Sequence, residues 1–73
     1  MIRCHLGRLM GEKKANIVDV ARATDLNRST VGALYHETAV RVELAALDRL
    51  CKFFNCKVSD LLEYVENEEQ NLQ

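Results

Sequence analysis

The residues best suited to chemistry lie in the segment N-R-S-T-V-G-A-L-Y-H, residues 27–36. Arg28 is its single strong cation, two hydroxyl side chains follow, and Gly32 and Ala33 carry almost no side chain. Exposed helix faces usually carry charged and polar side chains such as Glu and Lys. Short side chains instead let a helix backbone come close to another surface, as in a helix that enters the major groove of DNA. We therefore expect a DNA-reading helix here.

The histidines and cysteines indicate neither catalysis nor metal binding. Cys51 and Cys56 have the spacing C-x4-C, which is not the usual zinc pattern, and Cys51 falls on an apolar stripe. His5 and His36 have no evident partner, and the chain has no Ser/His/Asp set, no paired acids on one face and no phosphate-cradling glycine loop. We expect no enzyme activity, no cofactor and no metal.

Length and composition indicate one small globular domain. The chain has 73 residues, of which 48% are hydrophobic and 29% charged. It has no proline and only three glycines, which favours helices with short connections. Three cysteines are an odd number, which argues against a disulfide framework and fits a reducing compartment. No apolar run approaches the roughly 18 residues of a membrane span, and no leader peptide is evident. We expect a cytoplasmic protein.

The net charge of −1 conceals an asymmetry along the chain. Residues 1–41 carry seven Lys/Arg and four Asp/Glu, whereas residues 42–73 carry three and seven. A basic half of this kind orients a molecule toward a polyanion. Small domains also reach such an imbalance by chance, so the charge split alone does not identify a partner.

The spacing of apolar residues predicts five helices and an all-α fold. In the first helix, residues 1–14, one stripe holds Ile2, Leu6, Leu9 and Met10, while Gly7 and Gly11 are either tolerated or admit a close neighbour. The other helices are expected over residues 17–24, 28–36, 43–54 and 60–65.

Local signals predict where these helices begin and end. Asn16 is an N-cap with Asp19 three positions later, and Asn27 is the N-cap of the reading helix. Asp25 and Leu26 form the turn between the two helices, with Leu26 pointing inward. The inward residues of these two helices are expected to be Ile17, Val20, Ala21, Val31 and Leu34.

The fourth and fifth helices are predicted in the same way. Asn55 ends the fourth helix in the left-handed conformation, and Ser59 caps the fifth. The fourth helix is expected to bury a stripe formed by Leu44, Leu47, Leu50, Cys51 and Phe54.

Taken together, residues 2 to about 66 resemble the Cro/repressor-type (XRE-like) helix-turn-helix domains, in a compact single-domain branch. The matching segments are I-R-C-H-L-G-R-L-M, D-V-A-R-A-T-D-L-N-R-S-T-V and L-D-R-L-C-K-F-F-N-C-K-V-S-D-L-L-E-Y-V. The third is the most diagnostic, since DNA contact does not dictate it. The turn position that is most often Gly in the family is Asp25 here, and Asp tolerates left-handed backbone better than most residues.

The resemblance implies a five-helix repressor-like domain in residues 1–65, with the second and third helices forming the helix-turn-helix, and a polar acidic tail in residues 66–73. It also implies which residues touch DNA. The implied base contacts are Arg28, Ser29, Gly32 and Ala33, with Arg28 donating to guanine. The implied backbone contacts are Asn16, Asn27, Thr30, His36 and Arg41.

The function implied is sequence-specific binding of double-stranded DNA by a transcriptional repressor. One short helix reads half a site, so a homodimer is expected, and helix five with the tail is the predicted dimer surface. We expect no membrane association and no small-molecule ligand. The alternative is a protein-interaction or antitoxin-like module that kept the fold with weak or no DNA binding.

Overall fold

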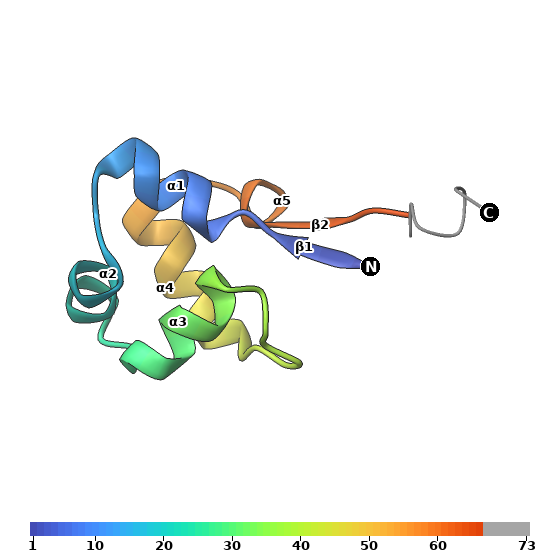
Figure 1. The fold of residues 1–73 in the computed structure, drawn as a ribbon. Coiled ribbons are helices and arrows are strands. Elements are labelled where there is room, and N and C mark those ends of the chain that lie inside the picture. The colour runs from blue at the N-terminus through green and yellow to red at the C-terminus, as the bar shows by residue number, and fades with distance from the viewer. Residues whose placement is uncertain (67–73) are drawn as a thin grey trace.

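The computed structural model describes residues 1–66, which form five helices and a two-stranded sheet (Figure 1). The predicted five-helix fold is therefore confirmed, with two short strands added at its ends. The elements in order are β1 (Ile2–Cys4), α1 (Leu6–Lys13), α2 (Ile17–Thr24), α3 (Arg28–Tyr35), α4 (Leu44–Phe54), α5 (Val58–Leu61) and β2 (Leu62–Tyr64).

One hydrophobic core holds the five helices together, and α4 lies behind α3 in Figure 1. Leu6, Val20, Val31, Leu50 and Leu61 are fully buried, one from each helix. Burial of a large aliphatic side chain contributes about 1.5–3 kcal/mol, so this small domain depends on each of them. The inward residues predicted for the second and third helices, Val20, Ala21, Val31 and Leu34, are all buried, and Ile17 packs partly buried against the core.

The N-terminal residues differ from the prediction. Ile2–Cys4 form β1 instead of the first turn of a helix, and α1 begins only at Leu6. The strand pairs antiparallel with β2, with Arg3 opposite Glu63. Strand pairing supplies hydrogen-bond partners for backbone groups that a helix would have bonded internally. Ile2 consequently leaves the predicted apolar stripe and is 63% exposed.

The last helix is also shorter and earlier than predicted. It spans Val58–Leu61, and Ser59 lies inside it instead of capping it. The start is stabilised by Asp60, whose Oδ2 accepts the backbone N–H of Lys57 at 2.9 Å. The segment after Leu61 turns extended because β2 pairs with β1, and the backbone N–H of His5 donates to the Leu61 carbonyl at 2.8 Å.

The fourth helix follows the prediction except at its first residue. Asn55 ends it with φ 53°, in the predicted left-handed conformation. Leu44, predicted to be buried, is 82% exposed, and Ala46 takes its place in the core. Cys51 and Phe54 are half-buried against the core. The prediction fails at Leu44 because this residue is the first of α4 and directly follows an exposed loop.

Two further predictions concern membrane-spanning helices and the C-terminal tail. None of the helices in residues 1–66 is long and apolar enough to cross a membrane. The predicted acidic tail, residues 66–73, lies outside the described residues apart from Glu66, which is exposed.

Candidate nucleic-acid interface

Hydrogen bonds define both ends of α2 and the turn that leads into α3. Asn16 Oδ1 accepts the backbone N–H of Asp19 at 2.8 Å, and Asp19 Oδ2 accepts the backbone N–H of Asn16 at 3.1 Å, so the predicted cap is confirmed as a reciprocal capping box. At the other end, Asp25 adopts φ 59° and ψ 36°. The buried hydroxyl of Thr24 donates to the Val20 carbonyl at 2.6 Å, so this core polar group is satisfied.

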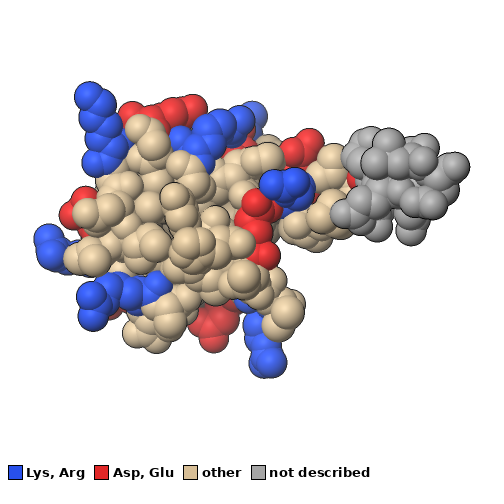
Figure 2. All heavy atoms as spheres, viewed as in Figure 1, with Lys and Arg blue, Asp and Glu red and all other residues tan. Residues whose placement is uncertain are grey.

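Helix α3 has a buried side and an open side. Val31 is fully buried and Leu34 is 4% exposed, which fixes the helix against the core. Arg28 and Ser29 are exposed at the start of the helix, while Gly32 and Ala33, one turn later, are partly exposed. Figure 2 shows a face that is uncharged across its middle, with Lys and Arg projecting at its edge beside α2. The four predicted base-contact residues thus have surface exposure at the start and middle of one helix.

The N-terminal end of α3 keeps its polar groups available. Asn27 occupies the predicted N-cap position, but its side chain makes no cap hydrogen bond within residues 1–66. The Arg28 side chain likewise has no hydrogen bond or ion pair to another residue of the described chain. A helix N-terminus also presents unpaired backbone N–H groups and a partial positive charge. This end can therefore donate to acceptors on a DNA groove or phosphate.

Gly32 lies where a second surface could come close. A Cβ atom built on Gly32 would meet no heavy atom within 4 Å, so nothing in the described chain requires a glycine there. Glycine costs a helix interior about 1 kcal/mol relative to alanine. The open space above it fits the predicted role of Gly32, which is to permit close approach.

Three of the predicted phosphate contacts meet in one hollow beside α3. Asn27, Thr30 and Arg41 line a hollow of about 360 Å³ between the turn, α3 and the start of α4. Arg49 of α4 lines it too and donates to the Asp25 carbonyl at 3.3 Å. Arg49 was not predicted from the sequence, because a separation of 24 residues from the turn carries no local signal. The acids Asp25 and Glu43 also line the hollow and partly offset its positive charge.

The other two predicted phosphate contacts lie away from this hollow. Asn16 lies at the start of α2, and its Oδ1 is already used by the capping box. Its side-chain amide N–H groups and the first backbone N–H groups of α2 remain as donors. His36 is exposed at the C-terminal end of α3 and packs edge-on against Tyr35, with ring centroids 4.9 Å apart. Eight helical residues place it about 12 Å from Arg28.

Tyr35 explains one of the two glycines in α1. A Cβ atom on Gly7 would lie 3.3 Å from the Tyr35 ring, whereas one on Gly11 would meet nothing within 4 Å. Gly7 therefore admits a close neighbour, and Gly11 is only tolerated. Tyr35 itself remains 42% exposed.

The loop after α3 is tied to the N-terminal strand. Glu37, with φ 59°, accepts hydrogen bonds from Arg3 Nε at 2.8 Å, Arg3 Nη2 at 2.9 Å and the Cys4 backbone N–H at 3.0 Å. The hydrogen bonds from Arg3 and then from Cys4 hold the pKa of the Glu37 carboxyl below its usual value, and the same contact raises the pKa of Arg3. The C-terminal end of α3 is thus anchored by a charged contact.

Comparison with known protein families places most of the chain in a described family. Residues 5–67 match the family of Cro/C1-type helix-turn-helix DNA-binding domains, which is most of the 73-residue chain. Comparison with curated proteins gives no match. The family match confirms the resemblance and the fold class predicted from the sequence.

Proposed function

The chain belongs to the family of Cro/C1-type helix-turn-helix DNA-binding domains, and from that premise we propose that it represses transcription by reading a specific operator with α3. DNA binding and a part in transcription regulation follow from the family, which is not a family of enzymes. Sequence specificity, repression and the contact residues are the proposal. The observation that carries it is the open N-terminal end of α3, where Arg28 and Asn27 keep their donors unpaired within residues 1–66.

Arg28 is the proposed main base contact. Its guanidinium can donate two parallel hydrogen bonds to guanine O6 and N7, which is the commonest specific contact in the major groove. Ser29 beside it would donate to a base or a phosphate. One turn on, Ala33 would meet a thymine methyl group, and Gly32 would let the helix backbone come close.

The proposed backbone contacts flank this helix. Asn27, Thr30 and Arg41 would hold phosphates on the side of the hollow that they share. Asn16 would do so at the start of α2, and His36 at the far end of α3. Such contacts fix the register of the protein on the duplex without reading its sequence.

Binding as a homodimer is part of the proposal. Helix α3 has eight residues, so it is about 12 Å long and spans only a few base pairs. Two copies reading half-sites about one DNA turn apart would give a two-fold operator of ordinary length. A dimer covering a promoter would exclude other proteins from it, which suffices for repression.

A selection of bound sequences from a random duplex library tests this function. We expect a two-fold consensus with a guanine in each half-site, and Arg28→Ala should lower affinity for it by about 1–3 kcal/mol, roughly 5- to 150-fold, while relaxing the guanine preference. The control is Lys52→Ala, which removes an exposed cation of α4. Equal affinity of the wild type and Arg28→Ala for the consensus would remove Arg28 from the readout.

A binding titration with random duplex DNA tests the alternative function. A DNA-reading domain binds random duplex DNA at low salt through its phosphate contacts. Absence of any binding at micromolar protein would overturn the proposal and favour a protein-interaction or antitoxin-like module on this fold.

A further inference from the structure

Two of the three cysteines lie on either side of the turn that ends α4. Cys51 belongs to the last turn of the helix, and Cys56 follows Asn55, whose φ of 53° reverses the chain. The backbone N–H of Cys56 donates to the Cys51 carbonyl at 3.0 Å. That of Asn55 donates to the Lys52 carbonyl at 3.3 Å. This pair of hydrogen bonds defines a Schellman motif, in which side chains at the two cysteine positions often meet.

The hydrogen bond between Cys56 and Cys51 also limits the distance between their Cα atoms. Standard bond lengths and angles, added to the N···O distance of 3.0 Å, leave these two atoms less than about 7 Å apart. A disulfide joins cysteines whose Cα atoms are about 4.4–6.8 Å apart. The backbone therefore already brings the two residues within reach of a disulfide.

The two thiol groups share one environment. Both are free and half-buried, and both pack against the hydrophobic core. Burial first, and then the nearby Cys51 thiol, raises the pKa of the Cys56 thiol. An effect of one thiol on the other requires the two sulfur atoms to be close neighbours. The raised pKa also keeps Cys56 mostly protonated at neutral pH, and a protonated thiol is not a nucleophile.

We propose that Cys51 and Cys56 form an oxidisable thiol pair, which a peroxide converts into an intramolecular disulfide that joins the end of α4 to the segment before α5. The Cys51 thiolate attacks one oxygen of hydrogen peroxide, the O–O bond breaks, and Cys51 becomes a sulfenic acid as hydroxide leaves. The Cys56 thiolate then attacks the Cys51 sulfur, which forms the S–S bond and releases a second hydroxide. The two protons lost by the thiols convert both hydroxides to water. The thiols lose two electrons, and the peroxide gains them.

The shared turn favours the second step over competing reactions. Because both thiols are held in one motif, the attack of Cys56 is intramolecular and has a high effective concentration. That concentration offsets the small thiolate fraction of Cys56. The disulfide should therefore form before Cys51 is oxidised further or bonds to a second protein molecule.

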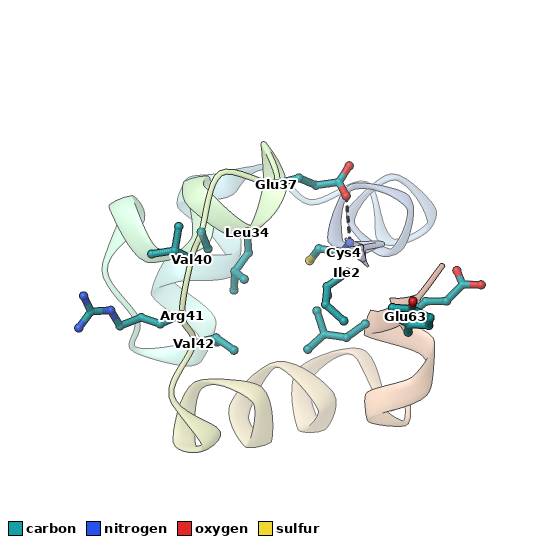
Figure 3. Close-up of a pocket in the computed structure, with 11 residues that line it drawn as sticks. Ile2, Cys4, Leu34, Glu37, Val40, Arg41, Val42 and Glu63 are labelled. Carbon is teal, nitrogen blue, oxygen red and sulfur yellow. Dashed lines mark hydrogen bonds between the residues drawn. The ribbon is translucent and has the colours of Figure 1, made fainter. Parts of the chain in front are cut away.

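The third cysteine, Cys4, lies in another part of the fold and provides an internal comparison. It belongs to β1 and lines a cavity of about 420 Å³ between the loop after α3 and the sheet (Figure 3). Its backbone N–H donates to Glu37 at 3.0 Å, the contact that Figure 3 marks with a dashed line. Neither Cys51 nor Cys56 lines this cavity or contributes to the raised pKa of the Cys4 thiol, which burial causes first. An oxidant should leave Cys4 outside the disulfide.

The disulfide acts beside the shortest helix of the fold. α5 has only four residues, too few for a helix that is stable by itself. Leu61 at its end is nevertheless fully buried, and its carbonyl accepts the backbone N–H of His5. A covalent bond at Cys56 restrains the unfolded chain next to this helix and so favours the folded state. In a reducing compartment the bond lasts only while the oxidant persists, so folding stability would follow the redox state.

Oxidation of the full chain without DNA tests the thiol pair. The reduced Cys4→Ala variant is treated with a small molar excess of hydrogen peroxide at mildly alkaline pH. We expect a monomer that has lost two hydrogen atoms and both thiols, and that regains them with dithiothreitol. Trypsin cleaves after Lys52, between the two cysteines, so the disulfide should hold the two fragments together until it is reduced. The wild type should form the same disulfide and keep Cys4 reduced.

The matched controls each keep one thiol of the pair. Cys51→Ala and Cys56→Ala, in the Cys4→Ala background, should gain oxygen atoms or form disulfides between molecules, and neither should lose two hydrogen atoms as a monomer. Circular dichroism under reducing conditions should show that both controls keep the helix content of the parent variant.

Thermal unfolding tests the effect on the fold. Because the disulfide closes a short loop in the unfolded chain, oxidised Cys4→Ala should have a Tm about 5–15 °C above that of the same variant after reduction. The comparison uses one sequence in two redox states, so no substitution affects the difference.

Three results would overturn the inference. The first is a product that gains oxygen atoms without losing two hydrogen atoms, and the second is a wild-type disulfide that includes Cys4. The third is an oxidised chain whose Tm is equal to or below that of the reduced chain, which would remove the link to folding stability. None of these measurements uses DNA, so their failure leaves the proposed function intact, and a failure of operator binding leaves the thiol pair intact.

Discussion

The two ends of α3 are built in opposite ways. At the N-terminal end, neither Asn27 nor Arg28 has a side-chain hydrogen bond to the described chain. At the C-terminal end, Glu37 accepts three hydrogen bonds from Arg3 and Cys4, and so ties the loop after the helix to β1. One end of the same helix is open to a ligand, and the other is fixed to the scaffold.

This difference teaches how a small domain can present a recognition helix. Unpaired donors are useful only if they are held in position, because a mobile side chain loses entropy on binding. The buried residues Val31 and Leu34 hold the middle of α3, and Glu37 holds its far end. The free end can then remain polar without losing its orientation.

Among substitutions beyond Arg28, Gly32→Leu should have the largest effect on the side of α3 that is proposed to face DNA. We expect Gly32→Leu to lower operator affinity about 10- to 100-fold, because a large side chain would keep the helix from the bases and cost at least one good base contact. The same substitution should raise folding stability by up to about 1 kcal/mol, since a helix interior disfavours glycine and the site is open. Fluorescence anisotropy and urea unfolding measure the two effects.

The matched control for that change is Gly11→Leu. Gly11 is also a helical glycine at which an added Cβ atom would meet nothing within 4 Å, but it lies in α1. Its substitution should raise stability similarly and leave operator affinity unchanged. A Gly32→Leu variant that binds like the wild type would show that α3 does not approach DNA closely at this position.

Substitution of Arg41 tests whether the residues beside α3 bind DNA without reading its sequence. We expect Arg41→Ala to weaken binding to every duplex by a similar factor, roughly 3- to 10-fold, and to reduce the slope of log affinity against log salt by about 1. The measurement should use single half-site duplexes, so that any effect on dimerisation is avoided. A change in sequence preference instead would mean that Arg41 reads a base.

Local sequence signals predicted the helix-turn-helix well. Asn16 and Asp19 are three residues apart, and Asp25 lies directly after α2, so each acts through neighbours along the chain. The apolar spacing that placed Val31 and Leu34 inward also placed Arg28 and Ser29 outward. The orientation of the candidate site therefore followed from helical periodicity alone.

Contacts between distant segments could not be predicted in this way. β1 and β2 are three residues each, and their pairing joins residues about 60 positions apart. The bonds from Arg3 to Glu37 and from Arg49 to Asp25 likewise have no local pattern. Leu44 fits the apolar spacing of α4 and is nevertheless exposed. The strand pairing and the contacts of Arg3 and Arg49 lie around α3 and the turn before it, so the sequence indicated the reading helix better than its surroundings.

Substitution of Asp25, in the turn between α2 and α3, should have a smaller effect, and on folding stability alone. Asp25 has φ 59°, a left-handed conformation that glycine adopts without steric cost. We expect Asp25→Gly to raise the free energy of unfolding by about 0.5 kcal/mol and to leave operator affinity unchanged. Asn55→Gly, at φ 53° beyond α4, is a control of the same kind away from the interface. A loss of stability in urea unfolding would show that the Asp25 side chain supports the turn.

The smallest effect is expected at the fixed end of α3. Glu37→Gln removes the charge that pairs with Arg3, and an exposed ion pair contributes little. The pKa of Glu37 is held below its ordinary value of about 4.5 in the folded chain, so this contact stabilises the fold fully above that value. As the pH falls through the lowered pKa, the folded carboxyl takes up a proton and the contribution is lost.

The variant should therefore be slightly less stable than the wild type at neutral pH, and the two should converge in acid. Urea midpoints measured from neutral pH to about pH 3 follow this difference directly. A difference that stays constant with pH would mean that Glu37 acts through its shape and its bond to the Cys4 N–H, which glutamine keeps. In that case the C-terminal end of α3 is fixed by neutral hydrogen bonding, and its contrast with the open end does not depend on charge.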